Sequence, residues 1–121
     1  MNTTHTEQVQ AMRQQVKAAL VALGWAGLDS TALAEKSFAT VVGPKVAHVY
    51  LQDFGAQSQA FILAGAYWSE GRNILEGCGI LIQKEAQSAE VSALVQKFIA
   101  GVEAAVGASY AVRLMRAPLA A

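Results

Sequence analysis

Three residues in the middle of the chain could do chemistry: His48, Glu76 and Cys78. An imidazole oriented by a carboxylate can act as a general base, and a thiol can act as a nucleophile. Cys78 stands between two glycines with no Lys or Arg beside it, which favours a packing role over a reactive thiol. The chain has two histidines and one cysteine and no spacing typical of metal ligands or phosphate loops. The sequence therefore predicts neither a metal site nor a cofactor.

A catalytic pairing of His48 with Glu76 depends on the register of the strands that carry them. In one register His48 lies opposite Gly65, which lies opposite Glu76, so the backbones of the two polar residues are about 9 to 10 Å apart across the glycine. Tyr50 and Tyr67 would then line the same pocket as hydrogen-bond donors. A shift of one residue moves His48 to the other face. Because such a pair on an apolar surface is more often a satisfied polar contact than a catalytic dyad, a binding function is favoured over an enzyme.

Two amphipathic helices are expected to flank the strands. Apolar residues recur at helical spacing over 5–23, where a capping box precedes them, and again over 88–106, which Gly107 is expected to end. The segment 109–116 is expected to be either a last edge strand or a docked tail.

The middle of the chain predicts an antiparallel meander of four strands. Runs rich in β-branched and aromatic residues are separated by turn-forming residues, and a short helical turn is expected before the first run. The strands are expected at 37–42, 45–54, 59–68 and 73–83, and the turn at 29–36. We therefore expect one domain over 1–121 with a two-layer α+β fold, in which both helices pack on one face of the sheet.

The hairpin over 61–82 is apolar on both faces, which is unusual for a sheet with two helices. Ile62, Ala64 and Ala66 form a face of small side chains, which lets a helix approach closely, so the helices are expected there. The opposite face is expected to be the partner or dimer face. It carries Phe61, Leu63, Tyr67, Ile74, Cys78, Ile80 and Ile82.

Two helices cannot cover both sides of the sheet, so something else is expected on the remaining face. The candidates are a second copy of the chain, another protein, an apolar ligand, or the segment 25–40 folding back. A sheet that curls into a self-filled partial barrel, or helices on opposite faces, would remove the need for a partner. The turn at the hairpin tip is a second expected contact, because a tryptophan stands there beside an arginine. Its residues are Trp68, Glu70, Arg72 and Asn73.

Composition narrows the class of protein. The formal charge is zero and only 15% of residues are charged, which favours self-association and argues against nucleic-acid binding. With one cysteine and no internal disulfide, we expect a cytoplasmic setting. The N-terminal segment carries Glu7 and several glutamines, so an export signal is not expected, and no uninterrupted apolar run of about 18 residues predicts a membrane-spanning helix.

The expected function is binding. The order helix, antiparallel sheet, helix is similar to that of small bacterial secretion chaperones and of some toxin-immunity proteins, and this resemblance implies a dimer or a stoichiometric binder of another protein. The second hypothesis is a small-molecule-binding protein or small enzyme with a pocket over Gly65 lined by His48, Tyr50, Tyr67 and Glu76.

Overall fold

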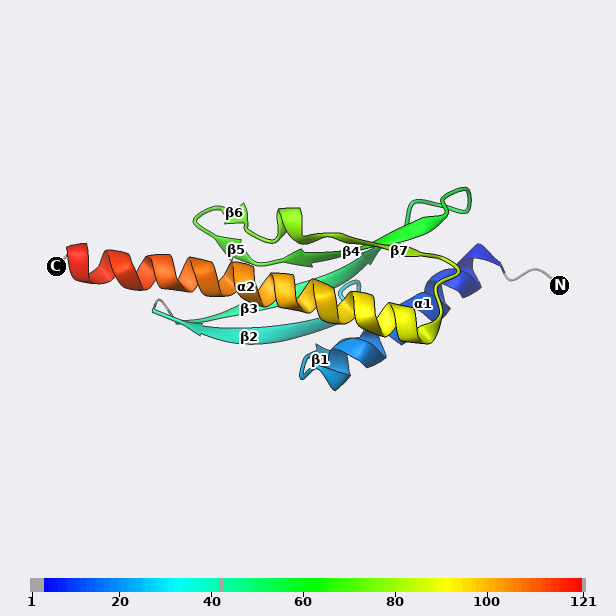
Figure 1. Ribbon diagram of the computed structural model, residues 1–121, viewed down its shortest axis with the longest axis horizontal. Coiled ribbons are helices and arrows are strands. Elements are labelled where there is room, and N and C mark those ends of the chain that lie inside the picture. The colour runs from blue at the N-terminus through cyan, green and yellow to red at the C-terminus, as the bar shows by residue number, and fades with distance from the viewer. Residues whose placement is uncertain (1–3, 42, 121) are drawn as a thin grey trace.

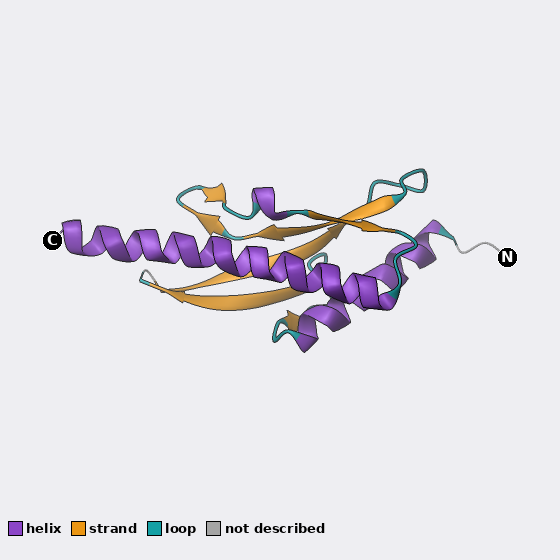
Figure 2. Cartoon of the chain, viewed as in Figure 1, coloured by secondary structure: helices purple, strands orange, loops and turns teal. Residues whose placement is uncertain are grey.

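The computed structural model describes residues 4–41 and 43–120, with side chains as far as Ser109. It contains two helices, a five-stranded antiparallel sheet in the order β1-β2-β3-β4-β7, and a two-stranded hairpin of β5 and β6, which confirms the α+β class. Figure 1 shows α2 lying along the sheet, and in Figure 2 the strands lie behind it, with the two chain ends at opposite ends of the molecule. The elements are α1 (His5–Ala22), β1 (Ala26–Gly27), β2 (Ala34–Thr40), β3 (Gly43–Gln52), β4 (Ala60–Ala66), β5 (Trp68–Ser69), β6 (Arg72–Asn73), the 3-10 helix η1 (Glu76–Cys78), β7 (Ile80–Gln83) and α2 (Ser88–Ala120).

The first helix begins with the predicted capping box. The Glu7 N–H donates to the Thr4 hydroxyl at 3.1 Å, and the Thr4 N–H donates to the Glu7 carboxylate at 3.2 Å. Two backbone donors that the helix itself leaves unpaired are thereby satisfied. The helix ends at Ala22, and Gly24 follows with φ of 95°, a conformation that suits glycine.

The second helix is longer than the sequence predicts. It continues to Ala120, so the expected end at residue 106 and the edge strand over 109–116 are wrong, whereas the alternative of a docked tail depends on side chains outside the described ones. A glycine inside a helix costs only about 1 kcal/mol relative to alanine. Since Ala104, Ala105 and Ala108 lie within one turn of Gly107, the helix continues through it.

The described part of α2 from Ser88 to Ser109 is long and apolar enough to cross a membrane, judged by length and composition only. In this fold its apolar stripe forms part of the core, where Val91, Val95 and Phe98 are at most 1% exposed. Core helices of folded domains meet the same criterion of length and composition, so the criterion does not distinguish them from membrane-spanning helices. The predicted absence of a membrane span therefore stays a prediction.

The segment 29–36 is not a helical turn, contrary to the prediction. Residues 29–33 form bends and Ala34 already belongs to β2. The buried Leu33 fixes this path, since its N–H donates to the Val49 carbonyl at 2.7 Å and its carbonyl accepts from the Leu28 N–H at 2.9 Å. β1 pairs with the start of β2, which adds a fifth strand to the meander.

The predicted strand over 73–83 is divided into three parts. At the tip, β5 and β6 pair in the expected register with Trp68 opposite Asn73, and Glu70 and Gly71 both have positive φ, as a two-residue hairpin turn requires. The 3-10 helix η1 then interrupts the strand before β7 pairs with β4.

The interruption by η1 shifts the pairing by two residues. Leu63 lies opposite Ile80, where an unbroken hairpin would place it opposite Cys78. Because side chains alternate with a period of two, a shift of two keeps the side chains of β7 on their predicted face. The sorting fails at the break itself, where Leu75, and not Glu76, lies on the same side as Gly65.

The face that the helices cover is the opposite of the predicted one. Phe61, Leu63 and Ile82 are fully buried in one core with the apolar residues of both helices. The larger side chains give this face the greater apolar area, so covering it is worth more free energy than covering the alanine-rich face. Gly65 on the same side makes room for α2 and its surroundings, since a Cβ there would lie 3.3 Å from the Phe98 ring.

Candidate functional site

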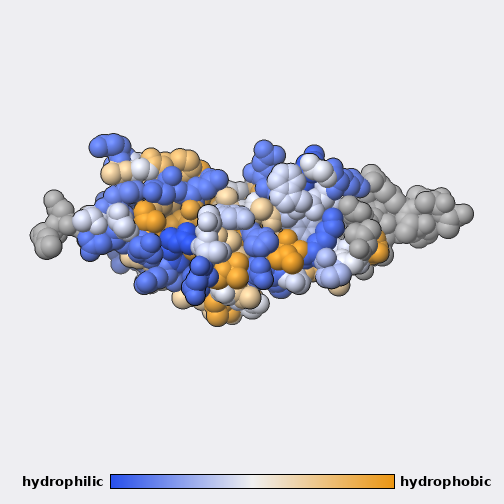
Figure 3. Space-filling view, turned by 180° about the vertical axis from the view of Figure 1, so that it is seen from behind, coloured by the Kyte–Doolittle hydropathy of each residue, from blue (hydrophilic) through white to orange (hydrophobic). Residues whose placement is uncertain are grey.

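The sheet has an uncovered face on the side away from the helices, which we call the outer face. Its residues alternate with the buried ones along β2, β3, β4 and β7, and the strand pairing places them side by side. They are Glu35, Ser37, Val46, His48, Tyr50, Gln52, Ile62, Ala64, Ala66 and Leu81. Seen from the side away from α2 (Figure 3), hydrophobic patches lie among hydrophilic residues over this region.

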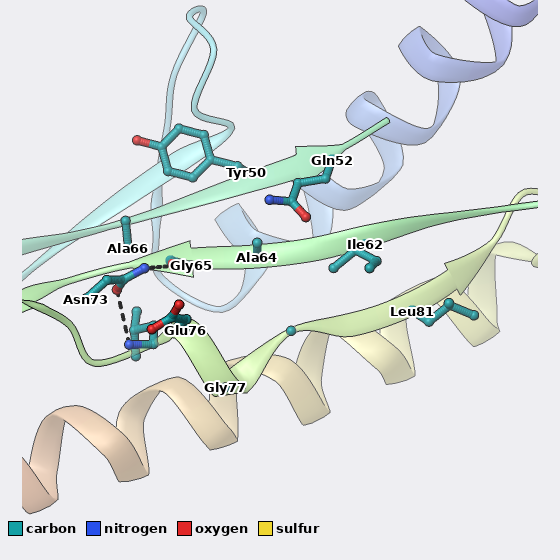
Figure 4. A pocket seen from close by; sticks show the side chains of 12 residues that line it. Tyr50, Gln52, Ile62, Ala64, Gly65, Ala66, Asn73, Glu76, Gly77 and Leu81 are labelled. Carbon is teal, nitrogen blue, oxygen red and sulfur yellow. Dashed lines mark hydrogen bonds between the residues drawn. The ribbon is translucent and has the colours of Figure 1, made fainter. Parts of the chain in front are cut away.

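A groove of about 630 Å³ lies on the outer face. Its floor is formed by small residues of β4, and Figure 4 shows Tyr50 and Gln52 of β3 on one side and Leu81 of β7 on the other. The lining residues are Tyr50, Gln52, Ile62, Ala64, Gly65, Ala66, Asn73, Leu75, Glu76, Gly77, Gly79 and Leu81. The lack of large side chains in the middle of the sheet is what leaves this space open.

Asn73 fixes the end of the groove next to the hairpin tip. Its side-chain oxygen accepts from the Tyr67 N–H at 2.9 Å and the Leu75 N–H at 3.1 Å, and its side-chain NH₂ donates to the Gly65 carbonyl at 3.0 Å. The amide thus replaces the ladder hydrogen bonds between the two strands at the point where regular pairing stops (Figure 4). Asn73 was predicted as a turn contact, and the structure gives it a positioning role.

The three candidate catalytic residues are separated. The register of β3 and β4 places Tyr50 opposite Ala64, not Leu63, so His48 lies opposite Ala66. The His48 Nε2 atom lies 3.2 Å from the Glu35 carboxylate on the neighbouring strand. Cross-strand pairing therefore gives His48 a carboxylate partner other than Glu76.

Glu76 and Cys78 both lie in η1 but face different surroundings. Glu76 is exposed and lines the groove, whereas Cys78 is half-buried against the core with its Sγ 3.9 Å from the Gly101 carbonyl. Of the pocket predicted over Gly65, Tyr50 and Glu76 are in place. Tyr67 is buried on the helix side, and His48 lies outside the groove lining.

The predicted partner face is part of the core. Four of its residues are at most 3% exposed: Phe61, Leu63, Tyr67 and Ile82. The remaining three, Ile74, Cys78 and Ile80, are half-buried and pack against the same core. None of the seven is available to a partner as the surface that the sequence predicted.

The predicted turn contact divides into an exposed and an internal part. Trp68 is 64% exposed, and Glu70 and Arg72 are exposed beside it. Tyr67 and Ser69 on either side of Trp68 are buried, so the alternation of side chains directs Trp68 to the outer face. Lys45 anchors this segment by donating to the Trp68 carbonyl at 3.2 Å.

A polar cluster at the other end of the sheet was not predicted. The His5 Nε2 atom lies 2.9 Å from the Asp53 carboxylate, and the Lys84 Nζ atom lies 3.4 Å from His5 Nδ1 and 3.1 Å from the Gly55 carbonyl. The Gly55 N–H and then the His5 imidazole hydrogen-bond to Asp53 and hold the pKa of its carboxyl below the ordinary value. The cluster joins the start of α1 to the β3–β4 turn and the end of β7.

Within residues 4–41 and 43–109 no group of three His, Cys, Asp or Glu side chains could hold a metal ion. Comparison with protein-family models, curated proteins and solved structures gives no match to this chain.

Proposed function

We propose that this chain is a non-enzymatic protein-binding protein and that the outer face, together with Trp68, is its binding surface. The observation that carries the proposal is the gathering of exposed apolar side chains on this side: Trp68 is 64%, Leu81 52% and Val46 39% exposed. Large apolar patches rimmed by polar residues are typical of protein contacts.

The electrostatics of the outer face favour a protein over a nucleic acid. The residues that define this face include no Lys or Arg, and its one imidazole is paired with a carboxylate. Phosphate binding needs a concentrated positive surface. A nearly neutral apolar face with a tryptophan at its rim instead matches the composition of protein-binding hot spots.

A small apolar ligand in the groove is the second candidate, and the arrangement of Tyr50, Asn73 and Glu76 around an apolar floor supports it. Polar groups at the rim of an apolar pocket are typical of small-molecule sites. Mass spectrometry of the protein purified under native conditions tests this candidate, which predicts a co-purified molecule displaced by Ala64→Phe.

Site-specific photo-crosslinking tests the proposed protein contact. A photoreactive phenylalanine at position 81, in cells that naturally make the chain, is expected to form a covalent adduct with a protein. The same group at position 54 is the control, because Phe54 is 57% exposed but lies in the β3–β4 turn beyond the outer face. Absence of a protein adduct at 81, or equal adducts at both positions, would refute the proposed surface.

A further inference from the structure

We propose that the outer face binds a segment of a partner protein that carries one arginine among apolar side chains, and that this arginine lies in the groove with its guanidinium group at the Glu76 carboxylate. This inference rests on the proposed function and names the chemistry of the partner. Three observations carry it: a carboxylate without a counter-ion, cations that are engaged elsewhere, and a groove floor that suits an aliphatic side chain.

The groove lining contains a single carboxylate, that of Glu76. Glu76 is exposed, and within residues 4–41 and 43–109 no hydrogen bond or ion pair engages its side chain. Glu35 on the outer face differs, because its carboxylate lies 3.2 Å from the His48 Nε2 atom. Glu76 is therefore an unmatched negative charge, which a partner can match with one cation.

Cations of the neighbouring elements are engaged away from Glu76. Lys45 of β3 donates to the Trp68 carbonyl at 3.2 Å, and Lys36 of β2 forms an ion pair with α2 on the helix side. Arg72 of the hairpin tip lines a separate hollow against α2. No described cation lines the groove, so the counter-ion of Glu76 has to come from another molecule.

The groove floor next to Glu76 suits the stem of an arginine. Ala64 and Ala66 present only methyl groups, and Figure 4 shows them between Tyr50 on one side of β4 and Glu76 on the other. An arginine covers apolar surface with its methylene groups, while its planar guanidinium group forms two parallel hydrogen bonds to a carboxylate. Its stem would cover Ala64 beside the Tyr50 ring, and its guanidinium group would reach Glu76.

The groove is longer than one side chain, which favours a protein segment as its occupant. Ile62 and Leu81 form the apolar end of the groove, and Leu81 is 52% exposed. Ile62 and Ala66 are four residues apart on β4, about 13 Å along an extended strand. One segment can supply both an apolar anchor near Leu81 and an arginine near Glu76, and arginine is among the residues that dominate protein contacts.

Selection from a random peptide library displayed on phage tests the chemistry of the partner. The peptides have about twelve residues, enough to span the groove at about 3.3 Å per extended residue. The immobilised full chain is expected to enrich peptides that combine an arginine with large apolar residues. A selection without any enriched sequence, or with enriched peptides that lack arginine, would overturn the inference.

A double-mutant cycle on the most enriched peptide then locates its arginine. Fluorescence anisotropy measures the Kd of this peptide and of a version with glutamine in place of the arginine. We expect Glu76→Gln to weaken the arginine peptide about 10-fold and to leave the glutamine version unchanged, because both substitutions remove the same charge pair. Unchanged binding of the glutamine version also reports that the variant is folded.

Glu85→Gln is the matched control for Glu76→Gln. Glu85 is also exposed but follows β7 and lies outside the groove lining, so its substitution should change neither Kd. Equal weakening of the arginine peptide by Glu76→Gln and Glu85→Gln would indicate only long-range charge attraction and would overturn the placement of the arginine at Glu76.

The outcomes separate this inference from the proposed function. Enriched peptides without arginine, together with a protein adduct from position 81, would overturn the arginine anchor and leave the proposed binding surface supported. Absence of a protein adduct at position 81 would refute the surface and, with it, this inference.

Discussion

Replacing Asn73 by alanine is expected to weaken the fold and the groove together. The side chain makes three backbone hydrogen bonds, to Tyr67 just after β4 at 2.9 Å, to Gly65 in β4 at 3.0 Å and to Leu75 after β6 at 3.1 Å. Alanine keeps the backbone path but removes all three partners. The N–H groups of Tyr67 and Leu75, both residues at most 3% exposed, would lose the acceptor that satisfies them.

The magnitude follows from the number of bonds. A hydrogen bond contributes about 0.5–1.5 kcal/mol net, and a buried donor left without a partner costs more, so Asn73→Ala should lower the free energy of unfolding by about 2–4 kcal/mol. This is a large fraction of the roughly 5–15 kcal/mol that stabilises a typical domain. Urea denaturation followed by circular dichroism measures the difference.

Two variants serve as controls for Asn73→Ala. Asn73→Asp keeps an acceptor for the two N–H groups but loses the donor to the Gly65 carbonyl, so its effect should be smaller. Gln57→Ala changes an exposed amide in the β3–β4 turn and should alter the free energy of unfolding by less than about 0.5 kcal/mol. If Asn73→Ala is no less stable than Gln57→Ala, the role assigned to the Asn73 amide is wrong.

Two further predictions concern packing and pH. Gly65→Ala places a Cβ 2.9 Å from the Leu75 side chain and should lower the free energy of unfolding by about 1–3 kcal/mol, whereas Gly77→Ala, with nothing within 4 Å, should be nearly neutral in thermal denaturation. The pKa of Asp53 is lowered by the Gly55 N–H and the His5 imidazole, so its carboxylate stabilises the fold above its unfolded-state pKa, and this stabilisation is lost as the pH falls through the folded-state pKa. Asp53→Asn should therefore be less stable than the wild type at pH 7 and equal to it well below about pH 4; a difference that persists at low pH would contradict this cause.

The sequence was sufficient to sort the residues of β4 and β7 into two faces, but not those at the break, where Leu75 takes the place beside Gly65 that was expected for Glu76. Alternation depends only on a period of two, and the extra residues at η1 number two, so Phe61 and Ile82 stay on one side as predicted. Which face the helices would cover could not be decided from small size alone. The helix α2 approaches the sheet closely at Gly65, a glycine among large side chains, and not over the row of alanines on the other face.

The register of β3 and β4 was beyond the reach of sequence patterns. It depends on the turn between them, where the Asp53 carboxylate accepts from the Gly55 N–H and Gly55 has φ of 96°. A change of one residue in the length of this turn changes the residue opposite His48 from Gly65 to Ala66. In the observed register the side-chain partner of His48 is Glu35. Neither Glu35 nor Leu81 was singled out as a site residue, although their alternation with buried neighbours could have indicated their face.

The contrasting positions of Trp25 and Trp68 give the protein two separate optical reporters. Trp25 is 2% exposed and its indole N–H has no hydrogen-bond partner among the described residues, so its emission should respond when the interior opens to water. Trp68 stands at the surface, where a soluble quencher reaches it unless another molecule covers it. Quenching at increasing protein concentration would thus read out assembly through one ring, while denaturant would read out unfolding through the other.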